Sequence, residues 1–299
     1  MKRKIGKRLL GIMMGLILAL TSVISVNATD SVVYEEETVD RIVKKLVSNN
    51  PELITHENRV HEGVGMLYTA GLDCEMIKDI EVVNDKIVYT FEYPNKITDK
   101  VSISKVNDGI LLNITEENIY NELKICDDGN MYLNGEKIQI EVNESSEEVA
   151  NKSLLMSSDN NNEIRGGEVT NWLTPTCPYG KKADYTYKLG TAKVADITLT
   201  AAIENLALSA FVSLICKKLG VSTVKSDALS SVFSYIKTRN PTTKGLSYIV
   251  TNYAHKDYHN TYIKPIGRYA YKSNYKWYPE KNYKGTAYSQ TLFFMKQIG

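Results

Sequence analysis

Apolar residues recur with a helical period in the first part of the chain. Between Thr38, which is able to cap a helix, and Pro51, they stand three and four positions apart and therefore share one helix face. These residues are Val39, Ile42, Val43 and Leu46. The spacing predicts an amphipathic helix that ends before the proline.

The period changes to two from Asp79 onward. Apolar side chains alternate with other residues in two runs, at Ile87, Tyr89, Phe91 and Tyr93 and at Ile138, Ile140 and Val142. Between such runs stand pairs such as Asn84-Asp85 and Asn134-Gly135, whose residues adopt positive φ at low cost and close hairpins. The pattern predicts an antiparallel β-meander with one or two helices packed on a face.

A long apolar stretch runs from Ile197 to Cys216. It predicts a helix from Leu199 to Leu219, because Lys217 and Lys218 suit a helix C-terminus and Gly220 suits a helix stop. A shorter helix is expected next, capped by Ser226 and ending before Pro241, with Leu229, Val232, Phe233 and Ile236 as its apolar residues. The two segments predict a hydrophobic helical hairpin.

Tyrosine is concentrated in residues 244–299, which hold ten of the twenty tyrosines, interleaved with Lys and Arg. This content and the intervening turn residues predict a few antiparallel strands. The predicted fold class is therefore α+β. It combines an N-terminal antiparallel β-meander with a packed helix and a C-terminal hydrophobic helical hairpin packed on a Tyr-rich antiparallel sheet.

The formal net charge of +1 conceals three segments of very different charge. Residues 1–28 carry +5, residues 29–168 carry −16 and residues 169–299 carry +12. With 43% hydrophobic and 24% charged residues, the composition excludes a collagen-like, coiled-coil, wholly disordered or polytopic membrane protein. Because opposite charges attract, we expect the acidic and basic halves to dock on each other, with the acidic half as a mask or pro-region.

The N-terminus has the pattern of a signal peptide. A basic stretch from Lys2 to Arg8 precedes an apolar run that reaches Val26, and Val26-Asn27-Ala28 suits a signal peptidase. We predict cleavage between Ala28 and Thr29 and a secreted, extracellular product. The alternative is an uncleaved anchor helix.

Residues 143–168 break every periodicity and are rich in Ser, Asn and Glu. They predict a disordered linker between an acidic α+β domain, residues 29–142, and a basic domain of helical hairpin and strands, residues 169–299. Arg165 and Gly166 form a site that a trypsin-like protease would accept. The alternative is a tether that is never cut.

Export permits disulfide bonds between the four cysteines. Two bridges, each within one half, suit two folded units: Cys74 with Cys126, and Cys177 with Cys216. The alternative for Cys216 is a free, buried thiol, because it lies in an apolar helix.

The candidates for catalysis or metal binding are weak. His255 and His259 are four residues apart, but the surrounding sequence indicates strand and turn, which separates such residues by about 13 Å. Cys177 lies in a loop without an activating sequence, although a pair with His255 stays open. We therefore expect no metal, no cofactor and no enzyme activity, with a hydrolase as the minor alternative.

The basic, aromatic half offers a binding surface. Tyr and Trp interleaved with Lys suit an anionic lipid surface or a cell-wall glycan, whereas export argues against nucleic acid. The candidate contacts are Lys272, Tyr275, Lys276, Trp277, Tyr278 and Tyr283. In the alternative interpretation, tyrosine fills the core of a small sheet.

The long apolar helix is either a core helix or an element that inserts into membranes. The candidate insertion residues are Leu206, Leu208, Phe211, Val212, Leu214 and Ile215. In that interpretation, the soluble protein keeps them hidden until the basic half meets a bilayer.

The layout from Ala183 through the Tyr-rich tail resembles that of the large non-lantibiotic bacteriocins of the geobacillin type, secreted by Gram-positive bacteria. The resemblance covers roughly residues 170–299 and assigns no functional residues. It implies an exported antibacterial protein that acts on the envelope of another bacterium. We expect a bacteriocin-like or toxin-like protein, with a non-toxic envelope-binding module as the alternative and the oligomeric state open.

Overall fold

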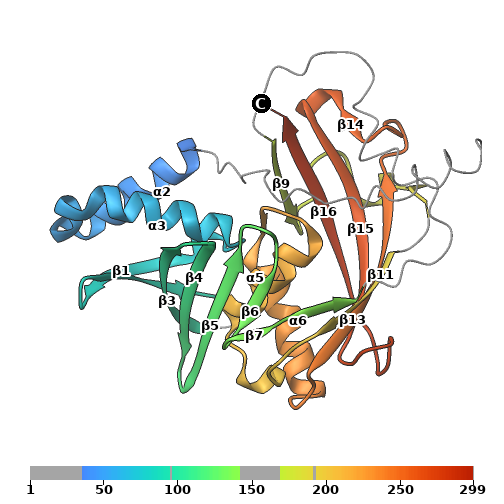
Figure 1. Cartoon of the computed structure of the whole chain (residues 1–299). Coiled ribbons are helices and arrows are strands. Elements are labelled where there is room, and N and C mark those ends of the chain that lie inside the picture. Colours follow the sequence, from blue (N-terminus) through green and yellow to red (C-terminus); the bar gives the residue numbers. More distant parts are fainter. Residues whose placement is uncertain (1–35, 95, 142–168, 191–192, 299) are drawn as a thin grey trace, which may run out of the picture.

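The computed structural model describes residues 36–94, 96–141, 169–190 and 193–298, which form two sheets with helices between and beside them (Figure 1). The N-terminal half begins with helices that lie on the first sheet. These are α2 (Glu36–Asn49), η1 (Pro51–His56), α3 (Glu57–Thr69) and η2 (Cys74–Met76). The face of α2 predicted from the sequence is buried, but the helix begins two residues before Thr38, which is therefore not its cap.

The first sheet is a meander in which each strand pairs with the next one along the chain. Asn84 and Asp85, and Asn134 with Gly135, adopt the positive φ values that the hairpin prediction required. The strands are β1 (Ile77–Val83), β2 (Lys86–Glu92), β3 (Thr98–Val106), β4 (Gly109–Glu116), β5 (Ile119–Cys126), β6 (Met131–Leu133) and β7 (Glu136–Lys137). The predicted antiparallel meander is confirmed.

Helix α3 packs closely on this sheet at Gly63. A Cβ atom on Gly63 would lie 2.0 Å from the Tyr89 hydroxyl oxygen, so only glycine fits there. Tyr89 is buried and donates its hydroxyl to the Val60 carbonyl at 3.2 Å. Its row on β2 alternates between buried and more exposed residues, as the period of two predicts.

The second sheet has the order β12-β9-β16-β15-β13-β11-β8, and β10 and β14 pair with β13 and β15. Its strands are β8 (Gln139–Glu141), β9 (Val169–Thr174), β10 (Tyr187–Lys188), β11 (Lys193–Thr198), β12 (Thr223–Val224), β13 (Gly245–Ala254), β14 (Tyr262–Ile263), β15 (Arg268–Tyr278) and β16 (Tyr288–Ile298). Three short 3₁₀ helices, η3 (Lys182–Asp184), η4 (Ile203–Asn205) and η5 (Lys264–Ile266), lie in its connections. The predicted Tyr-rich antiparallel sheet is confirmed; among the described strands, the short β12–β9 pair alone is parallel.

Strand β8 belongs to the second sheet, not to the N-terminal meander. The run at residues 138–142 was expected to continue the N-terminal meander, but β8 pairs with β11 of the second sheet. Ile138 of this run is buried, and Val142 lies outside the described residues. The N-terminal half therefore contributes an edge strand to the C-terminal sheet.

The predicted helical hairpin is present as α5 (Leu208–Leu219) and α6 (Ser226–Arg239). The expected start of the first helix at Leu199 is wrong by nine residues, because the preceding segment bonds to a loop instead. Leu199 N–H donates to Lys244 O at 2.7 Å, and Ile203 N–H donates to Thr243 O at 2.9 Å. Gly220 ends α5 at φ 65°, as predicted. With 12 residues, α5 is about 18 Å long, and among the described residues no helix is long and apolar enough to cross a bilayer.

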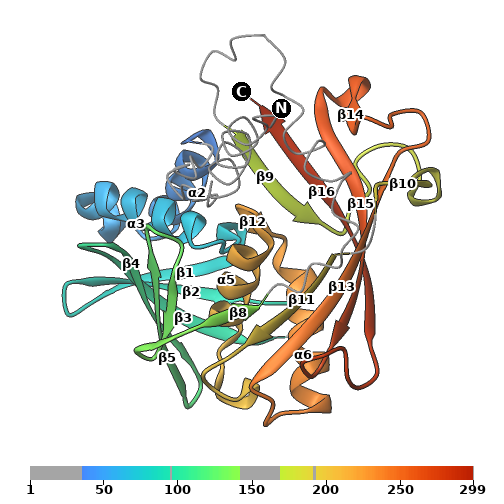
Figure 2. The ribbon, with the colours of Figure 1, turned by 45° about the vertical axis from the view of Figure 1, so that its right-hand side comes forward.

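Helix α5 lies between the two sheets, as both ribbon views show (Figures 1 and 2). Its residues Leu208 and Phe211 belong to the same continuous core as Leu112 and Ile114 of β4. The described parts of the two halves thus share one core. The predicted domain boundaries at residues 142 and 168, and the linker between them, stay predictions.

Candidate functional site

The most distinctive polar site lies where the N-terminal half meets the start of α5. Three side chains of the first sheet accept hydrogen bonds from three consecutive backbone N–H groups of that helix. The bonds join Ala207 N to Asn121 Oδ1 (2.7 Å), Leu208 N to Glu116 Oε2 (2.8 Å) and Ser209 N to Asp99 Oδ2 (2.6 Å). We call Asp99, Glu116 and Asn121 the clasp.

The clasp supplies hydrogen-bond acceptors that α5 lacks at its own N-terminus. The first N–H groups of a helix have no partner within it, and its N-terminus carries a partial positive charge. The N-cap of α5 is Ala207, which offers no side-chain acceptor. Carboxylates from β3 and β4 and an amide from β5 fill this role, and Asn121 also donates to Asn205 O at 3.0 Å.

Burial gives the clasp unusual electrostatics. Asp99 is fully buried, and this desolvation raises the pKa of its carboxyl to about 7, against the opposing effect of the hydrogen bonds from Ser209; the nearby Glu116 raises it further. Glu116 has a cation close by, Lys237 Nζ of α6 at 3.4 Å. The Tyr93 hydroxyl lies 2.7 Å from Ser209 Oγ and closes the site on the side of β2.

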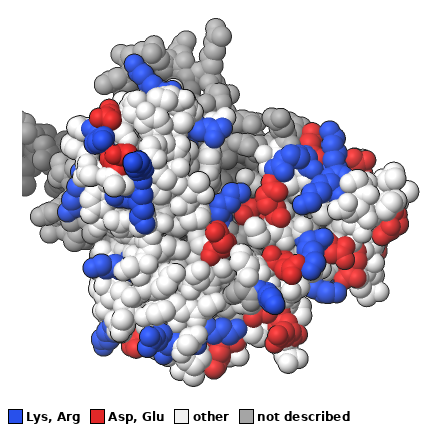
Figure 3. All heavy atoms as spheres, turned by 180° about the vertical axis from the view of Figure 1, so that it is seen from behind, with Lys and Arg blue, Asp and Glu red and all other residues white. Residues whose placement is uncertain are grey.

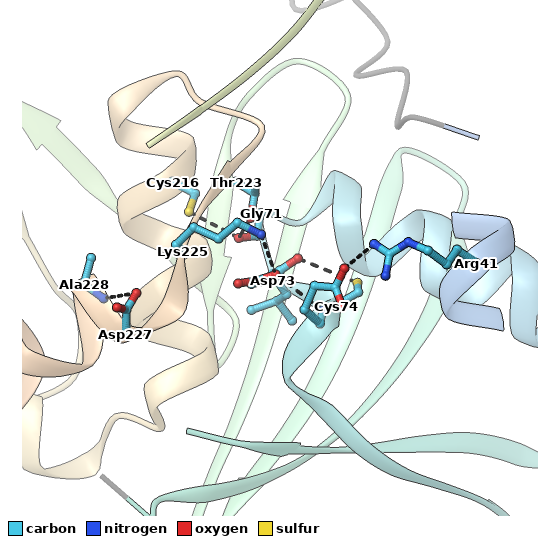
Figure 4. A network of polar contacts seen from close by, with 11 residues as sticks. Arg41, Gly71, Asp73, Cys74, Cys216, Thr223, Lys225, Asp227 and Ala228 are labelled. Atoms are coloured by element: carbon cyan, nitrogen blue, oxygen red, sulfur yellow. Dashed lines mark hydrogen bonds and ion pairs between the residues drawn. The ribbon is translucent and has the colours of Figure 1, made fainter. Parts of the chain in front are cut away.

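A second contact between the halves lies near the other end of α5 (Figure 4). The Gly71 carbonyl accepts from Cys216 Sγ at 3.2 Å and from Thr223 Oγ1 at 3.4 Å. The buried Asp73 carboxylate lies 3.5 Å from Lys225 Nζ. Gly71 has φ +86°, and a Cβ there would lie 2.5 Å from Cys216 Cβ. The turn before η2 is thus shaped to fit against α5.

This second contact continues onto α2. Asp73 Oδ1 accepts from the Glu75 N–H at 3.4 Å, and Glu75 forms an ion pair with Arg41 of α2. The Arg41 hydrogen bond lowers the pKa of Glu75. Figure 4 shows Arg41, Asp73 and Lys225 following one another from α2 towards α6. The clasp at Ala207 to Ser209 and the Gly71 carbonyl at Cys216 together hold both ends of α5 against the N-terminal half.

All six candidate insertion residues lie in the core between the sheets. Leu206, Leu208, Phe211, Val212, Leu214 and Ile215 are each at most 3% exposed. Ser209 and Ser213 of the same helix are buried as well. Insertion therefore requires that the two halves separate.

The predicted surface contacts are only partly at the surface. Trp277 is 0% exposed and donates to Gln290 Oε1 at 3.1 Å, and Tyr275 is buried beside it. Alternation along β15 turns these two rings toward the helices, so their assignment as surface residues is corrected. Lys276 is exposed, Tyr278 and Tyr283 are half-buried, and Lys272 donates to the carbonyl of Tyr185.

All four cysteines are free thiols, so neither Cys74–Cys126 nor Cys177–Cys216 is bridged. This corrects both expected disulfides. Cys74 and Cys216 are buried, and desolvation raises the pKa of the Cys216 thiol to about 12. Burial also raises the pKa of Cys177, whose thiol donates to the Tyr179 carbonyl at 3.4 Å. Cys177 therefore has no activated thiolate.

The two histidines of the weak metal candidate are in different environments. His255 is 3% exposed and lies among the rings of Tyr179, Tyr185 and Tyr258. His259 is exposed and stacks on Tyr187. Within the described ranges, no group of three or more His, Cys, Asp or Glu side chains is placed to hold a metal ion.

Several predicted features lie outside the described residues. These are the cleavage site at Ala28 and Thr29, the linker at 143–168 and the processing site at Arg165 and Gly166. They stay predictions.

Comparison with known proteins gave no match to any family model, curated protein or solved structure. The assignment of a function therefore depends on the site itself.

The sequence interpretation missed the clasp. Asp99, Glu116 and Asn121 each occupy an inward position of an apolar row, beside Val101, Ile114 and Leu123 respectively. A polar residue in such a row is the signal that would have found them, because a buried polar group needs a partner. The sequence did not reveal which segment supplies that partner.

Proposed function

We propose that this is an exported toxin-like protein of the bacteriocin type, which acts on bacterial envelopes and is kept latent by its acidic N-terminal half. The observation that supports this proposal is the enclosure of α5. The most apolar helix of the basic half has its first three N–H groups bound by buried side chains of the acidic half.

Separation of the halves would change α5 in two ways. Its first turn would lose all three acceptors, and the apolar residues that face β3 and β4 would meet water. A helix with an uncovered apolar surface gains free energy when it enters a bilayer interface. The basic charge of residues 169–299 would favour anionic membranes once the acidic half no longer offsets it.

The experiment uses the full mature chain with a recognition sequence for a specific protease inserted between Arg165 and Gly166. Dye release from vesicles rich in phosphatidylglycerol is measured before and after the cut. We expect no release by the intact chain and release by the cut chain. The clasp variant Glu116→Ala/Asn121→Ala should release dye at about one-tenth of the concentration after the cut, because it lowers the cost of separation by roughly 1.4 kcal/mol or more.

The matched control is Glu81→Ala/Asn113→Ala, which changes the same residue types elsewhere on the first sheet. Glu81 forms an exposed ion pair with Lys100, and Asn113 accepts from the exposed Tyr120. This control should behave like the wild type. Equal release by intact and cut chains would contradict latency, and no release by the cut clasp variant would contradict membrane action.

A non-toxic envelope-binding module is the second candidate, and one observation favours it. Strand β8 of the N-terminal half pairs with β11, and both halves share a core, as expected for halves that never separate. In that case the two fragments of the cut chain elute together in gel filtration and leave vesicles intact. The intact chain would then sediment with purified cell walls.

A further inference from the structure

The end of the second sheet away from α2 and α3 carries a concentration of basic and aromatic residues. Figure 2 places β10 and β14 there. Two loops, residues 179–188 and 255–268, contain six basic and two acidic residues. We call this surface the cationic tip, and its basic residues are Lys181, Lys182, Lys188, Lys256, Lys264 and Arg268. Figure 3 shows basic side chains predominating over the C-terminal half on the face seen from behind, and mixed with acidic ones over the N-terminal half.

The two loops are held together as a fixed surface. Tyr185, Ile263, Ala270, Phe293 and Met295 form a small core of their own beneath them. Tyr187 of β10 pairs with Ala254 of β13, and Lys256 forms an ion pair with Asp184 at 3.0 Å. The tip is therefore preorganised, which lowers the entropic cost of binding.

Most of the positive charge at the tip is not neutralised. Asp184 is already engaged, because it accepts from the Lys181 N–H at 2.8 Å and pairs with Lys256. Lys181, Lys182, Lys188 and Lys264 are exposed, and none of them forms an ion pair with another residue that the structure describes. A surface of this kind attracts a polyanion.

The tip also presents a flat ring surface. Tyr187 is 47% exposed and stacks on His259, with centroids 4.0 Å apart and an angle of 9° between the rings. Lys188 follows Tyr187 directly in the sequence. Among the described residues, Tyr187 is the one strongly exposed large hydrophobic side chain at the tip, so its ring is the main apolar surface there. A ring surface beside lysines suits sugar rings that carry negative groups.

We propose that the cationic tip binds a phosphate-bearing glycan of the cell envelope, with Tyr187 and His259 as the stacking surface and Lys181 and Lys182 as phosphate contacts. This inference deepens the proposed function by naming the surface and the ligand class, and it rests on that function for the envelope as location. It replaces Trp277 and Tyr275, which are buried, as the aromatic contacts.

Binding of the intact mature chain to purified, N-acetylglucosamine-bearing wall teichoic acid tests the proposal. The affinity is measured at about 50 and about 200 mM NaCl, because phosphate contacts make it fall with salt. Inorganic polyphosphate and neutral dextran serve as comparison polymers, and we expect weaker binding to both. Vesicles of phosphatidylglycerol and single-stranded DNA complete the set.

Two variants separate the ring and charge contributions. Tyr187→Ser should weaken binding to teichoic acid about tenfold, as lost stacking contacts do, and should leave polyphosphate binding unchanged. Lys181→Gln/Lys182→Gln should weaken binding to both polymers and reduce the salt dependence. The matched controls are Tyr120→Ser, a 57% exposed ring on the first sheet, and Lys86→Gln/Lys105→Gln. The controls should bind like the wild type.

The proposal is overturned if teichoic acid does not bind at low salt, or if the control variants weaken binding as much as the tip variants. Equal binding of polyphosphate, or stronger binding of vesicles or DNA, also overturns it, because the ligand would then not be a glycan. Thermal unfolding of each variant verifies that it is folded. This test uses the intact chain, so its result is independent of the latency test. Binding to teichoic acid can be absent while latency holds, and latency can be wrong while the tip binds teichoic acid.

Discussion

At the residue scale, the buried carboxyl of Asp99 makes the contact between the two halves depend on pH. It lies on β3, and the groups around it come from four elements: Tyr93 after β2, Glu116 on β4, the start of α5 and, through Glu116, Lys237 on α6. One of its oxygens has no hydrogen-bond partner among the described atoms. A proton on Asp99 would relieve both its desolvation and its repulsion with Glu116.

The raised pKa of Asp99 predicts that stability falls as pH rises. The pKa is about 7 in the folded protein and about 3.9 in an unfolded chain, so the native state binds the extra proton between these values. The free energy of unfolding should therefore decrease from about pH 4 to about pH 7 and stay level above, by at most roughly 4 kcal/mol from this group. Asp99→Asn should remove this slope and raise the melting temperature at alkaline pH.

Urea unfolding at several pH values, for the wild type and for Asp99→Asn, measures this effect. The control is Asp127→Asn, because Asp127 is exposed in a turn of the same sheet. If Asp99→Asn keeps the slope of the wild type between pH 5 and 8, Asp99 is not the group responsible.

At the element scale, the boundaries of α5 are set by different kinds of interaction. Its C-terminus is set by neighbouring residues, since Gly220 adopts a left-handed conformation directly after Leu219, the last residue of the helix. Its N-terminus is set by segments far away in the sequence. Ala207 cannot cap the helix, and side chains from β3, β4 and β5 do so instead. The first turn of the helix therefore depends on the acidic half for its hydrogen-bond acceptors.

Removal of one clasp residue should destabilise this helix end. Asn121→Ala removes three hydrogen bonds of a fully buried side chain and should lower the free energy of unfolding by about 2 kcal/mol. Hydrogen exchange should become faster at the amides of Ala207 and Leu208, near the lost contact. The control Asn113→Ala, on the exposed side of the neighbouring strand, should cost less than about 0.5 kcal/mol. Similar losses for both variants would mean that the cap contributes little.

At the scale of the whole molecule, the two halves form one packed body in which each contributes to the other. The N-terminal half supplies the cap of α5 and strand β8, and the C-terminal half supplies the apolar helix that fills the core over β3 and β4. Cys216 reports on this contact, since its thiol donates to the carbonyl of Gly71 in the other half.

Thiol labelling measures whether the halves stay together. In the folded, intact chain we expect two reactive thiols, the half-buried Cys126 and Cys177, while the buried Cys74 and Cys216 react only after denaturation. After a cut within residues 143–168 and separation of the halves, Cys216 should also react. Labelling of Cys216 in the intact chain at the rate of Cys177 would contradict the packed interface. Absence of any reactive thiol would indicate disulfide bonds instead.

The sequence predicted the elements well where the signal was local. The buried face of α2, the alternation of Tyr89 and Phe91 on β2, and the apolar residues of α6 all lie as the periodicity indicated. It failed where an apolar run had two possible uses. Residues 199–207 are as apolar as a helix requires, yet the N–H groups of Leu199 and Ile203 donate to the carbonyls of Lys244 and Thr243 instead.

By itself, the sequence determined the period of α2, β2 and α6 and the hairpin turns of the first sheet, because side-chain period and turn residues act over a few positions. It also determined the charge of each half, which is a sum over residues. Only the tertiary structure decided that Trp277 and Tyr275 face the core, that Asp99 and Glu116 cap α5 and that Tyr187 is presented at the cationic tip. These outcomes depend on which distant segments pack together, as in the contact between residues 99 and 209, and the spacing of residues along the chain does not specify that pairing.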